Sequence, residues 1–98
     1  MKSWKLIKSM KIIKYSGQFK KDFKRYHKDR AKVEKLLEVI RMLENEIELP
    51  AQYRLHKLKG DYKDCWECHV DGDYLLIWID ETAQIIRVLR LGSHSELF

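Results

Sequence analysis

The feature that most constrains the fold is a run of six consecutive apolar residues, Y-L-L-I-W-I, at positions 74–79. A strand that is apolar at every position is typical of the centre of a sheet that is covered on at least one face. The Asp-Gly pair at positions 71–72, just before this run, is a strong signal for a two-residue hairpin turn. We therefore predict a β-hairpin in which a strand at Lys63–Val70 leads into a strand at Asp73–Ile79.

The N-terminal part of the chain predicts a strand followed by a helix. The alternating run K-I-I-K-Y begins after Met10 and suits an edge strand that ends at Ser16. Ser16 is also a favoured N-cap residue for the helix that follows. Phe19, Phe23 and Tyr26 have the spacing that puts them on one face of this helix, and most of the other positions are Lys or Arg.

A second helix is predicted from Asp29, a common N-cap residue, to about Asn45. Its apolar positions recur with helical spacing, and the short connection between the two helices favours an antiparallel helical hairpin. Pro50 prevents the helix from continuing, so residues 48–62 are expected to form an irregular loop.

The last predicted strand, I-I-R-V-L-R-L, follows a turn at positions 81–84 and ends at Gly92. The order of elements is then β-α-α-β-β-β. This order predicts an α+β domain in which a two-helix hairpin packs on a mostly antiparallel sheet. A chain of 98 residues is long enough for one such domain with a single modest core.

The charge of the chain is unevenly distributed. Residues 1–35 contain thirteen Lys or Arg and three Asp or Glu, a local charge of +10, whereas residues 36–98 contain seven and twelve, a local charge of −5. The basic third is expected to attract a polyanion such as RNA or an acidic protein partner. The alternative interpretation is an ordinary solvated helix surface. No apolar run approaches the roughly 20 residues that span a bilayer. We therefore expect a cytoplasmic protein without membrane contact.

The stretch from His56 to Tyr74 is dense in side chains that transfer protons and bind ions. Alternation along a strand places Glu67 and His69 on the same face, and the hairpin brings His69 close to Asp73. A single histidine is usually structural or solvated, but several histidines with adjacent acids suit proton transfer near neutral pH. If the last strand lies beside the hairpin, His94 reaches the same sheet edge as His56.

Cys65 and Cys68 have a spacing that is compatible with redox or zinc chemistry. In a strand, however, this spacing puts the two thiols on opposite faces, and no second cysteine pair completes a zinc site. We therefore expect two reduced and dispensable cysteines. The sequence also lacks a Gly-rich phosphate loop and an acidic metal cage, so we expect no cofactor and no metal.

Several motifs in this order resemble the YafQ-like branch of the RelE/ParE toxin superfamily, the bacterial mRNA interferases of type II toxin–antitoxin modules. They are Y-S-G-Q-F-K-K-D at 15–22, L-P-A-Q-Y at 49–53, H-K-L-K-G at 56–60, E-C-H-V-D-G-D-Y at 67–74 and G-S-H-S-E-L-F at 92–98. The resemblance covers residues 10–98, which we take as the toxin domain. Residues 1–9 are then an N-terminal extension.

The resemblance implies a compact α+β fold and metal-free cleavage of mRNA in the A site of the 70S ribosome. It also implies a cognate antitoxin as protein partner. The family's active-site positions fall on His56, Glu67, His69, Asp73, His94 and Phe98, with Tyr74 at an aromatic position beside the acid.

Three residues depart from the family pattern. Trp66 stands where a basic residue is common, and Lys57 and Gly72 stand where prolines are found. The first departure bears on how the scissile phosphate is held. Residues that could substitute for it as RNA-binding cations are Lys59, Lys63 and Arg90.

The chemistry that the resemblance implies is attack of an RNA 2′-hydroxyl on the neighbouring phosphorus. Histidines can serve as its acid and its base, each contributing about 10²–10⁴-fold. We expect His56 or Asp73 near the 2′-hydroxyl and His94 near the leaving oxygen. His69, oriented by Glu67, is expected to stabilise the charged phosphorane. The alternatives are a module of the same fold that binds RNA or a partner without catalysis, and a ParE-like inhibitor of gyrase.

Overall fold

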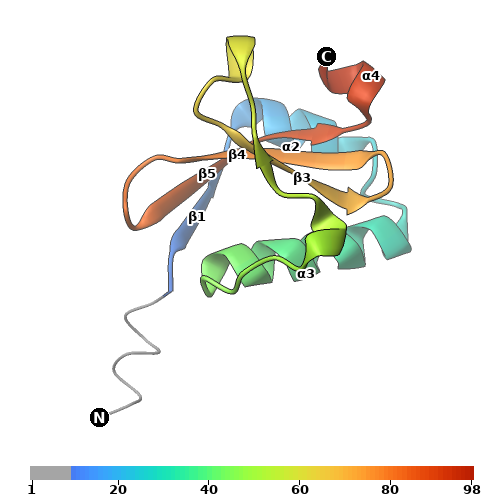
Figure 1. Ribbon diagram of the computed structural model, residues 1–98. Coiled ribbons are helices and arrows are strands. Elements are labelled where there is room, and N and C mark those ends of the chain that lie inside the picture. The colour runs from blue at the N-terminus through green and yellow to red at the C-terminus, as the bar shows by residue number, and fades with distance from the viewer. Residues whose placement is uncertain (1–9) are drawn as a thin grey trace.

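The structure is a computed structural model that describes residues 10–98, so the predicted extension at residues 1–9 lies outside the described residues. It is a five-stranded sheet with helices packed against it (Figure 1). The elements are β1 (Ile12–Tyr15), α2 (Gly17–Lys24), α3 (Arg30–Glu44), the 3₁₀ helix η1 (Ala51–Tyr53), β2 (His56–Lys57), the 3₁₀ helix η2 (Gly60–Tyr62), β3 (Trp66–Asp71), β4 (Tyr74–Asp80), β5 (Ile85–Gly92) and α4 (His94–Leu97).

The strands are arranged in the order β1-β5-β4-β3-β2. β1 pairs with β5 in parallel, and the other three pairings are antiparallel. The predicted fold class is therefore confirmed. β4 is the middle strand of the sheet, and Leu75, Leu76 and Ile77 within it are completely buried. This burial on both faces is the reason that the run at 74–79 is apolar at every position.

The two helices begin where the sequence predicts. The Ser16 hydroxyl accepts a hydrogen bond from the Phe19 N–H at 2.9 Å, and the Asp29 carboxylate accepts one from the Lys32 N–H at 3.2 Å. Each N-cap satisfies a backbone donor that the first helical turn leaves without a partner. No helix within residues 10–98 has the length and apolar character needed to cross a membrane.

The segment predicted as an irregular loop, 48–62, is more ordered than expected. It contains both 3₁₀ helices and β2, which pairs with β3 at the sheet edge. Accordingly, β3 begins at Trp66 and not at Lys63. A two-residue strand has too few positions to show a periodic pattern, so only its hydrogen bonds to the neighbouring strand define it.

The hairpin turn lies one residue further along the chain than predicted. Asp71 still pairs with Tyr74, and the register shifts between His69 and Asp71. The two turn residues are therefore Gly72 and Asp73, and Gly72 has a φ of 57°. Proline cannot adopt this φ, so glycine at this position gives a turn that the family's proline would not form.

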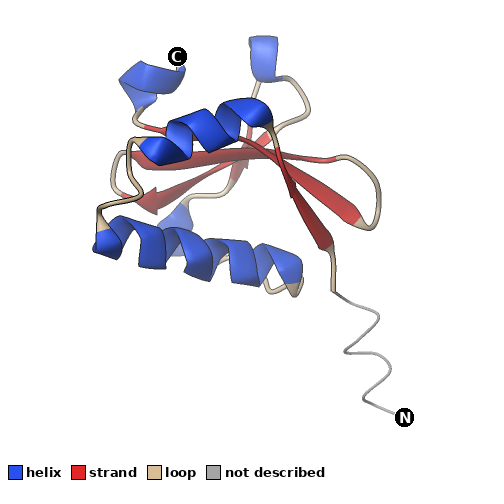
Figure 2. Ribbon diagram, turned by 180° about the vertical axis from the view of Figure 1, so that it is seen from behind, coloured by secondary structure: helices blue, strands red, loops and turns tan. Residues whose placement is uncertain are grey.

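The two faces of the sheet have separate apolar clusters. The larger cluster lies between α2, α3 and one face, and includes Phe19, Val39 and Cys68. The smaller cluster lies on the opposite face and includes Cys65 and Leu97. Figure 1 shows η2 (yellow) and α4 (red) projecting on the side of the sheet opposite α3, and Figure 2 shows the same layers from behind.

The prediction that the two cysteines lie on opposite faces is confirmed by these two clusters. Both thiols are free and buried. Burial raises the pKa of Cys68 to about 12, and it also raises the pKa of Cys65. Thiols of this kind are poor nucleophiles at neutral pH, because the thiolate is the reactive form.

Candidate active site

The edge pairing of β2 with β3 brings the first histidine to its acid. His56 lies directly opposite Glu67 in this pairing, and its Nε2 is 3.1 Å from Oε1 of Glu67. Glu67 is only 3% exposed, whereas the side chain of His56 is nearly half exposed. The pair therefore links a buried carboxylate to a histidine at the surface.

Both ring nitrogens of His56 face oxygen acceptors. Nδ1 lies 2.8 Å from the backbone carbonyl of Arg54, which can only accept a hydrogen bond. The Glu67 carboxylate at Nε2 is also an acceptor in its ionised form. The second oxygen of Glu67, Oε2, is buried without a hydrogen-bond partner among the described residues. A positive charge on the His56 ring would be stabilised by this adjacent buried carboxylate.

The second histidine, His69, is held differently. Its Nδ1 lies 2.8 Å from the Gly72 carbonyl across the hairpin turn, so Nδ1 is the donor. In the neutral ring Nε2 is then free to accept a proton. The prediction that Glu67 orients His69 is wrong, because Glu67 contacts His56 and the turn carbonyl orients His69. The two imidazole rings remain neighbours, with centroids 6.3 Å apart.

The third histidine lies at the start of α4. The N–H of His94 donates to Oδ1 of Asp73 at 2.9 Å, which ties this helix to the hairpin turn. The His94 ring packs on Phe98 with centroids 4.8 Å apart, and Phe98 meets the edge of Tyr62 at 5.5 Å. Asp73 and His69 in turn line one surface hollow of about 410 Å³. The predicted residues His56, Glu67, His69, Asp73, His94 and Phe98 thus come together on one face.

Helix α4 is also held in place by the contacts of Glu96. Ser93 and Glu96 form a capping box, and Glu96 accepts hydrogen bonds from Tyr26 and, at 2.9 Å, from Arg25. The Ser93 backbone N–H and the Tyr26 hydroxyl lower the pKa of Glu96 to about 2. A four-residue helix could not hold His94 in place without such anchors.

Arg90, predicted as an RNA-binding cation, is engaged inside the protein. Its Nε donates to Oδ2 of Asp22 at 2.8 Å, and its Nη1 donates to the Tyr62 hydroxyl at 3.2 Å. Burial raises the pKa of Asp22, but hydrogen bonds from Arg90 and the Leu91 N–H outweigh it and leave that pKa lowered. Lys59 and Lys63 flank η2 and are exposed.

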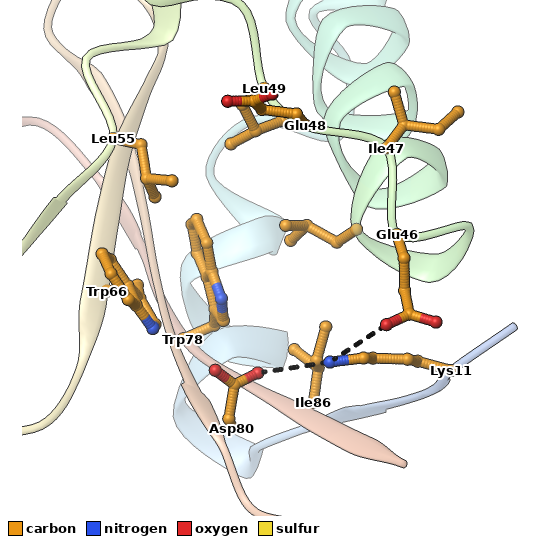
Figure 3. Close-up of a pocket in the computed structure, with 11 residues that line it drawn as sticks. Lys11, Glu46, Ile47, Glu48, Leu49, Leu55, Trp66, Trp78, Asp80 and Ile86 are labelled. Carbon is orange, nitrogen blue, oxygen red and sulfur yellow. Dashed lines mark ion pairs between the residues drawn. The ribbon is translucent and has the colours of Figure 1, made fainter. Parts of the chain in front are cut away.

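Two aromatic residues in the histidine-containing stretch, Trp66 and Tyr74, face away from the histidines. Tyr74 is 3% exposed, and its ring packs on Tyr26 at 4.8 Å. Trp66 lies in a separate hollow of about 300 Å³ beside Trp78, where Lys11 bridges two carboxylates (Figure 3). Position 66 therefore points away from the face that holds the histidines, and Lys57, opposite it in the sheet, lies over the Trp66 ring at 5.0 Å.

Among residues 10–98, no group of three or more His, Cys, Asp or Glu side chains has an arrangement that could hold a metal ion.

Proteins that resemble this chain in sequence and fold include bacterial toxins. Residues 11–98 match the family model described as "Bacterial toxin of type II toxin-antitoxin system, YafQ". The chain belongs to the YafQ toxin family.

Among YafQ relatives, the mRNA interferase toxin YafQ of Escherichia coli K12 is 38% identical over 89 residues, which cover 88% of this chain and 94% of that protein. The E. coli DinJ–YafQ toxin–antitoxin complex contains a chain with a TM-score of 0.79 and 37% identity, and the match covers 91% of this chain and 98% of that one. A metal-bound toxin from Helicobacter pylori has a TM-score of 0.81 and 39% identity, with coverages of 91% and 100%.

Some residues of this YafQ-family site were not identified from sequence. Tyr62 supports Phe98, and Asp22 holds Arg90, but neither lies in a pattern that indicates such a contact. Glu96 was detectable, because S-H-S-E at 93–96 is a capping-box sequence. Arg54 supplies a carbonyl to His56, which no side-chain pattern could reveal.

Proposed function

We propose that this chain is an endoribonuclease toxin that cleaves mRNA. The observation that supports this most strongly is the gathering of His56, His69 and His94 with Asp73 on one face of the sheet. The E. coli relative is named an mRNA interferase toxin, and this chain matches nearly all of its length. Clustered histidines with fixed ring orientations are suited to moving protons in RNA transesterification.

The hydrogen bonds support an exchange of the roles first expected for two histidines. His69 is the general base, because its Nε2 is free to take the 2′-hydroxyl proton. His56, paired with Glu67, provides a positive charge beside the phosphorane. His94 protonates the leaving 5′-oxygen. Asp73 positions the backbone of His94, which makes it a positioning residue.

We further propose that cleavage takes place on the ribosome in the cytoplasm. The part of the sequence that holds His56, His69 and His94, residues 36–98, has a net charge of −5, so it lacks the strongly basic groove that a free ribonuclease uses to hold RNA. A ribosome that already holds the mRNA removes the need for such a groove. Efficient cleavage of protein-free RNA at the same enzyme concentration would contradict this proposal.

The test is to induce the chain in bacteria and map transcript 5′ ends, then to analyse products made by purified protein on translating ribosomes. The expected products end in a 2′,3′-cyclic phosphate and a 5′-hydroxyl, because the attacking oxygen belongs to the RNA. The rate is expected to persist in a metal chelator. Products with a 5′-phosphate would require water as nucleophile and would refute the mechanism. Growth arrest with intact mRNA would favour a binding module or a gyrase inhibitor.

We also propose that a cognate antitoxin inhibits the chain. The E. coli relative is seen in a complex with DinJ. In this chain, α2, the turn after it and the beginning of α3 present exposed cations, namely Lys20, Lys21, Lys24, Lys28 and Arg30. These are suited to an acidic segment that folds on binding. Co-expression of the neighbouring gene is expected to restore growth.

A further inference from the structure

Transesterification adds negative charge to the phosphate, and a cation beside the histidines would stabilise it. The described cations near the site are mostly engaged elsewhere. Arg90 is held by Asp22, and Lys57 lies over Trp66 on the other face. Lys35 pairs with Asp71 at 3.2 Å. A further source of positive charge at the phosphate, in addition to His56, must therefore be sought among the remaining cations around the histidines.

Arg54 is the cation that the fold places there. It follows η1 directly and lines the 410 Å³ hollow together with Gln52, His69, Gly72 and Asp73. Within residues 10–98 its guanidinium forms no ion pair and no hydrogen bond with a protein group. The guanidinium is therefore available to an anion that enters the hollow beside His69.

The backbone of Arg54 is also unusual. Its φ of 48° and ψ of 47° are in the left-handed region, which a non-glycine residue adopts at an energetic cost. This conformation aims the Arg54 carbonyl at Nδ1 of His56. Strained backbone of this kind clusters at functional sites, where the surrounding structure maintains it. One residue thus holds a histidine by its carbonyl and lines the adjoining hollow.

We infer that Arg54 binds the non-bridging oxygens of the scissile phosphate and stabilises the phosphorane. This inference rests on the proposed ribonuclease function. A guanidinium suits the task because its planar set of N–H donors matches two phosphate oxygens at once. Lys59 and Lys63, in the exposed segment around η2, then contact the RNA backbone outside the reacting phosphate.

The step balances without any further reactant. The 2′-hydroxyl proton passes to Nε2 of His69 as the 2′-oxygen bonds to phosphorus. The bond from phosphorus to the 5′-oxygen then breaks, and His94 supplies the proton to that oxygen. Arg54 stays protonated throughout and only pairs with the negative charge. Its contribution is therefore to the reaction rate at saturating substrate.

Arg54→Gly is the decisive variant, because glycine adopts the left-handed conformation without strain and preserves the carbonyl that holds His56. We expect single-turnover cleavage on saturating ribosomes to fall about 10²-fold, as for loss of one transition-state donor. Arg54→Lys keeps the positive charge but not the planar guanidinium, so its cleavage rate should fall by less than that of Arg54→Gly. Low millimolar guanidinium should partly restore the glycine variant. Arg41→Ala on α3 removes an equal exposed charge and should retain wild-type rates.

The outcomes separate the inference from the function on which it rests. If the wild-type chain does not cleave, the proposed function fails. If the wild type cleaves and Arg54→Gly stays within threefold of it, Arg54 is not the phosphate ligand. A fall without guanidinium rescue, or a change confined to KM, would also overturn the inference. Thermal unfolding and antitoxin binding of the glycine variant should match wild type, which would show that the fold is intact.

Discussion

At the scale of single residues, the site is defined by which atoms of each imidazole are already engaged. His56 has Nδ1 in a hydrogen bond and Nε2 against the Glu67 carboxylate, whereas His69 has only Nδ1 engaged. A ring with one free nitrogen is able to exchange a proton with substrate, and a ring with two engaged nitrogens is better suited to supply charge. The identity of the residues alone does not distinguish these roles.

His94→Ala tests the general acid. We expect single-turnover cleavage to fall by about 10²-fold or more, because the leaving oxygen loses its proton donor. The fold should be unaffected, since the exposed His94 side chain lies close to the chain end. His27→Ala is the matched control, because His27 is an exposed histidine between α2 and α3. Equal rates for the two variants would remove His94 from the mechanism.

Replacement of both cysteines tests whether thiols take part. Cys65→Ala with Cys68→Ala should keep cleavage within about threefold of wild type, because both thiols are buried on different faces. Alanine is preferable to serine here, since a buried hydroxyl without a partner is destabilising. Purified wild-type protein should contain no stoichiometric zinc by elemental analysis. One zinc per chain would contradict the prediction.

At the scale of elements, α4 depends on side chains that reach it from other parts of the chain. Asp73 holds its first turn, and Glu96 connects it to α2 and to the segment after α2 through Arg25 and Tyr26. Gly92 fits closely beneath it, because a Cβ at this position would lie 2.9 Å from a Glu96 oxygen. The position of His94 is therefore determined by contacts over long sequence separations.

The anchor at Glu96 predicts a dependence of stability on pH. The folded-state pKa of Glu96 is about 2, below its ordinary value of 4.5. Its contribution to stability is present above pH 4.5 and is lost as the pH falls through 2. Glu96→Gln should reduce the unfolding free energy at pH 7 by at most about 1 kcal/mol after solvent screening, and the difference should vanish near pH 2. Thermal melts measure this difference in unfolding free energy, with Glu34→Gln at an exposed position as the control. A difference independent of pH would refute the assignment.

The Asp22–Arg90 pair joins α2 to β5 and should be important for stability. Asp22 is 2% exposed and also accepts the Leu91 N–H at 3.0 Å. Asp22→Ala leaves a poorly solvated guanidinium and a buried N–H without their acceptor, so we expect a loss of about 3 kcal/mol in unfolding free energy. Denaturant titration should detect it. Asp61→Ala, which replaces an exposed aspartate, should change the unfolding free energy little. An equally small change for both variants would contradict the prediction.

At the scale of the whole molecule, charge and chemistry are separated. Cations are concentrated on α2 and the start of α3, whereas α4, which begins at His94, lies on the side of the sheet opposite α3 (Figure 1). A partner that binds the basic helices and a substrate that binds the histidine face would therefore use different surfaces. Inhibition by such a partner requires a segment that extends from one surface to the other.

Binding of the antitoxin should depend strongly on salt. Surface charge pairs are screened at a distance of about 8 Å in physiological salt, so the affinity should weaken as ionic strength rises. Replacing Lys20, Lys21 and Lys24 with glutamine should weaken binding and reduce its salt dependence, with cleavage unchanged. Titration calorimetry at several salt concentrations measures both effects. Salt-independent binding would place the interface elsewhere.

The sequence by itself determined the central strand, the N-caps at Ser16 and Asp29 and the α+β class, and it supplied the set of candidate site residues. These properties follow from local patterns and ordered motifs, which the chain shows without folding. Tertiary structure alone decided that β2 pairs with β3, that Glu67 holds His56, that Arg90 is neutralised by Asp22, and that Tyr74 faces away from the site. Each of these depends on two segments meeting in space, and a backbone pairing or a buried ion pair leaves no periodic signal in either segment.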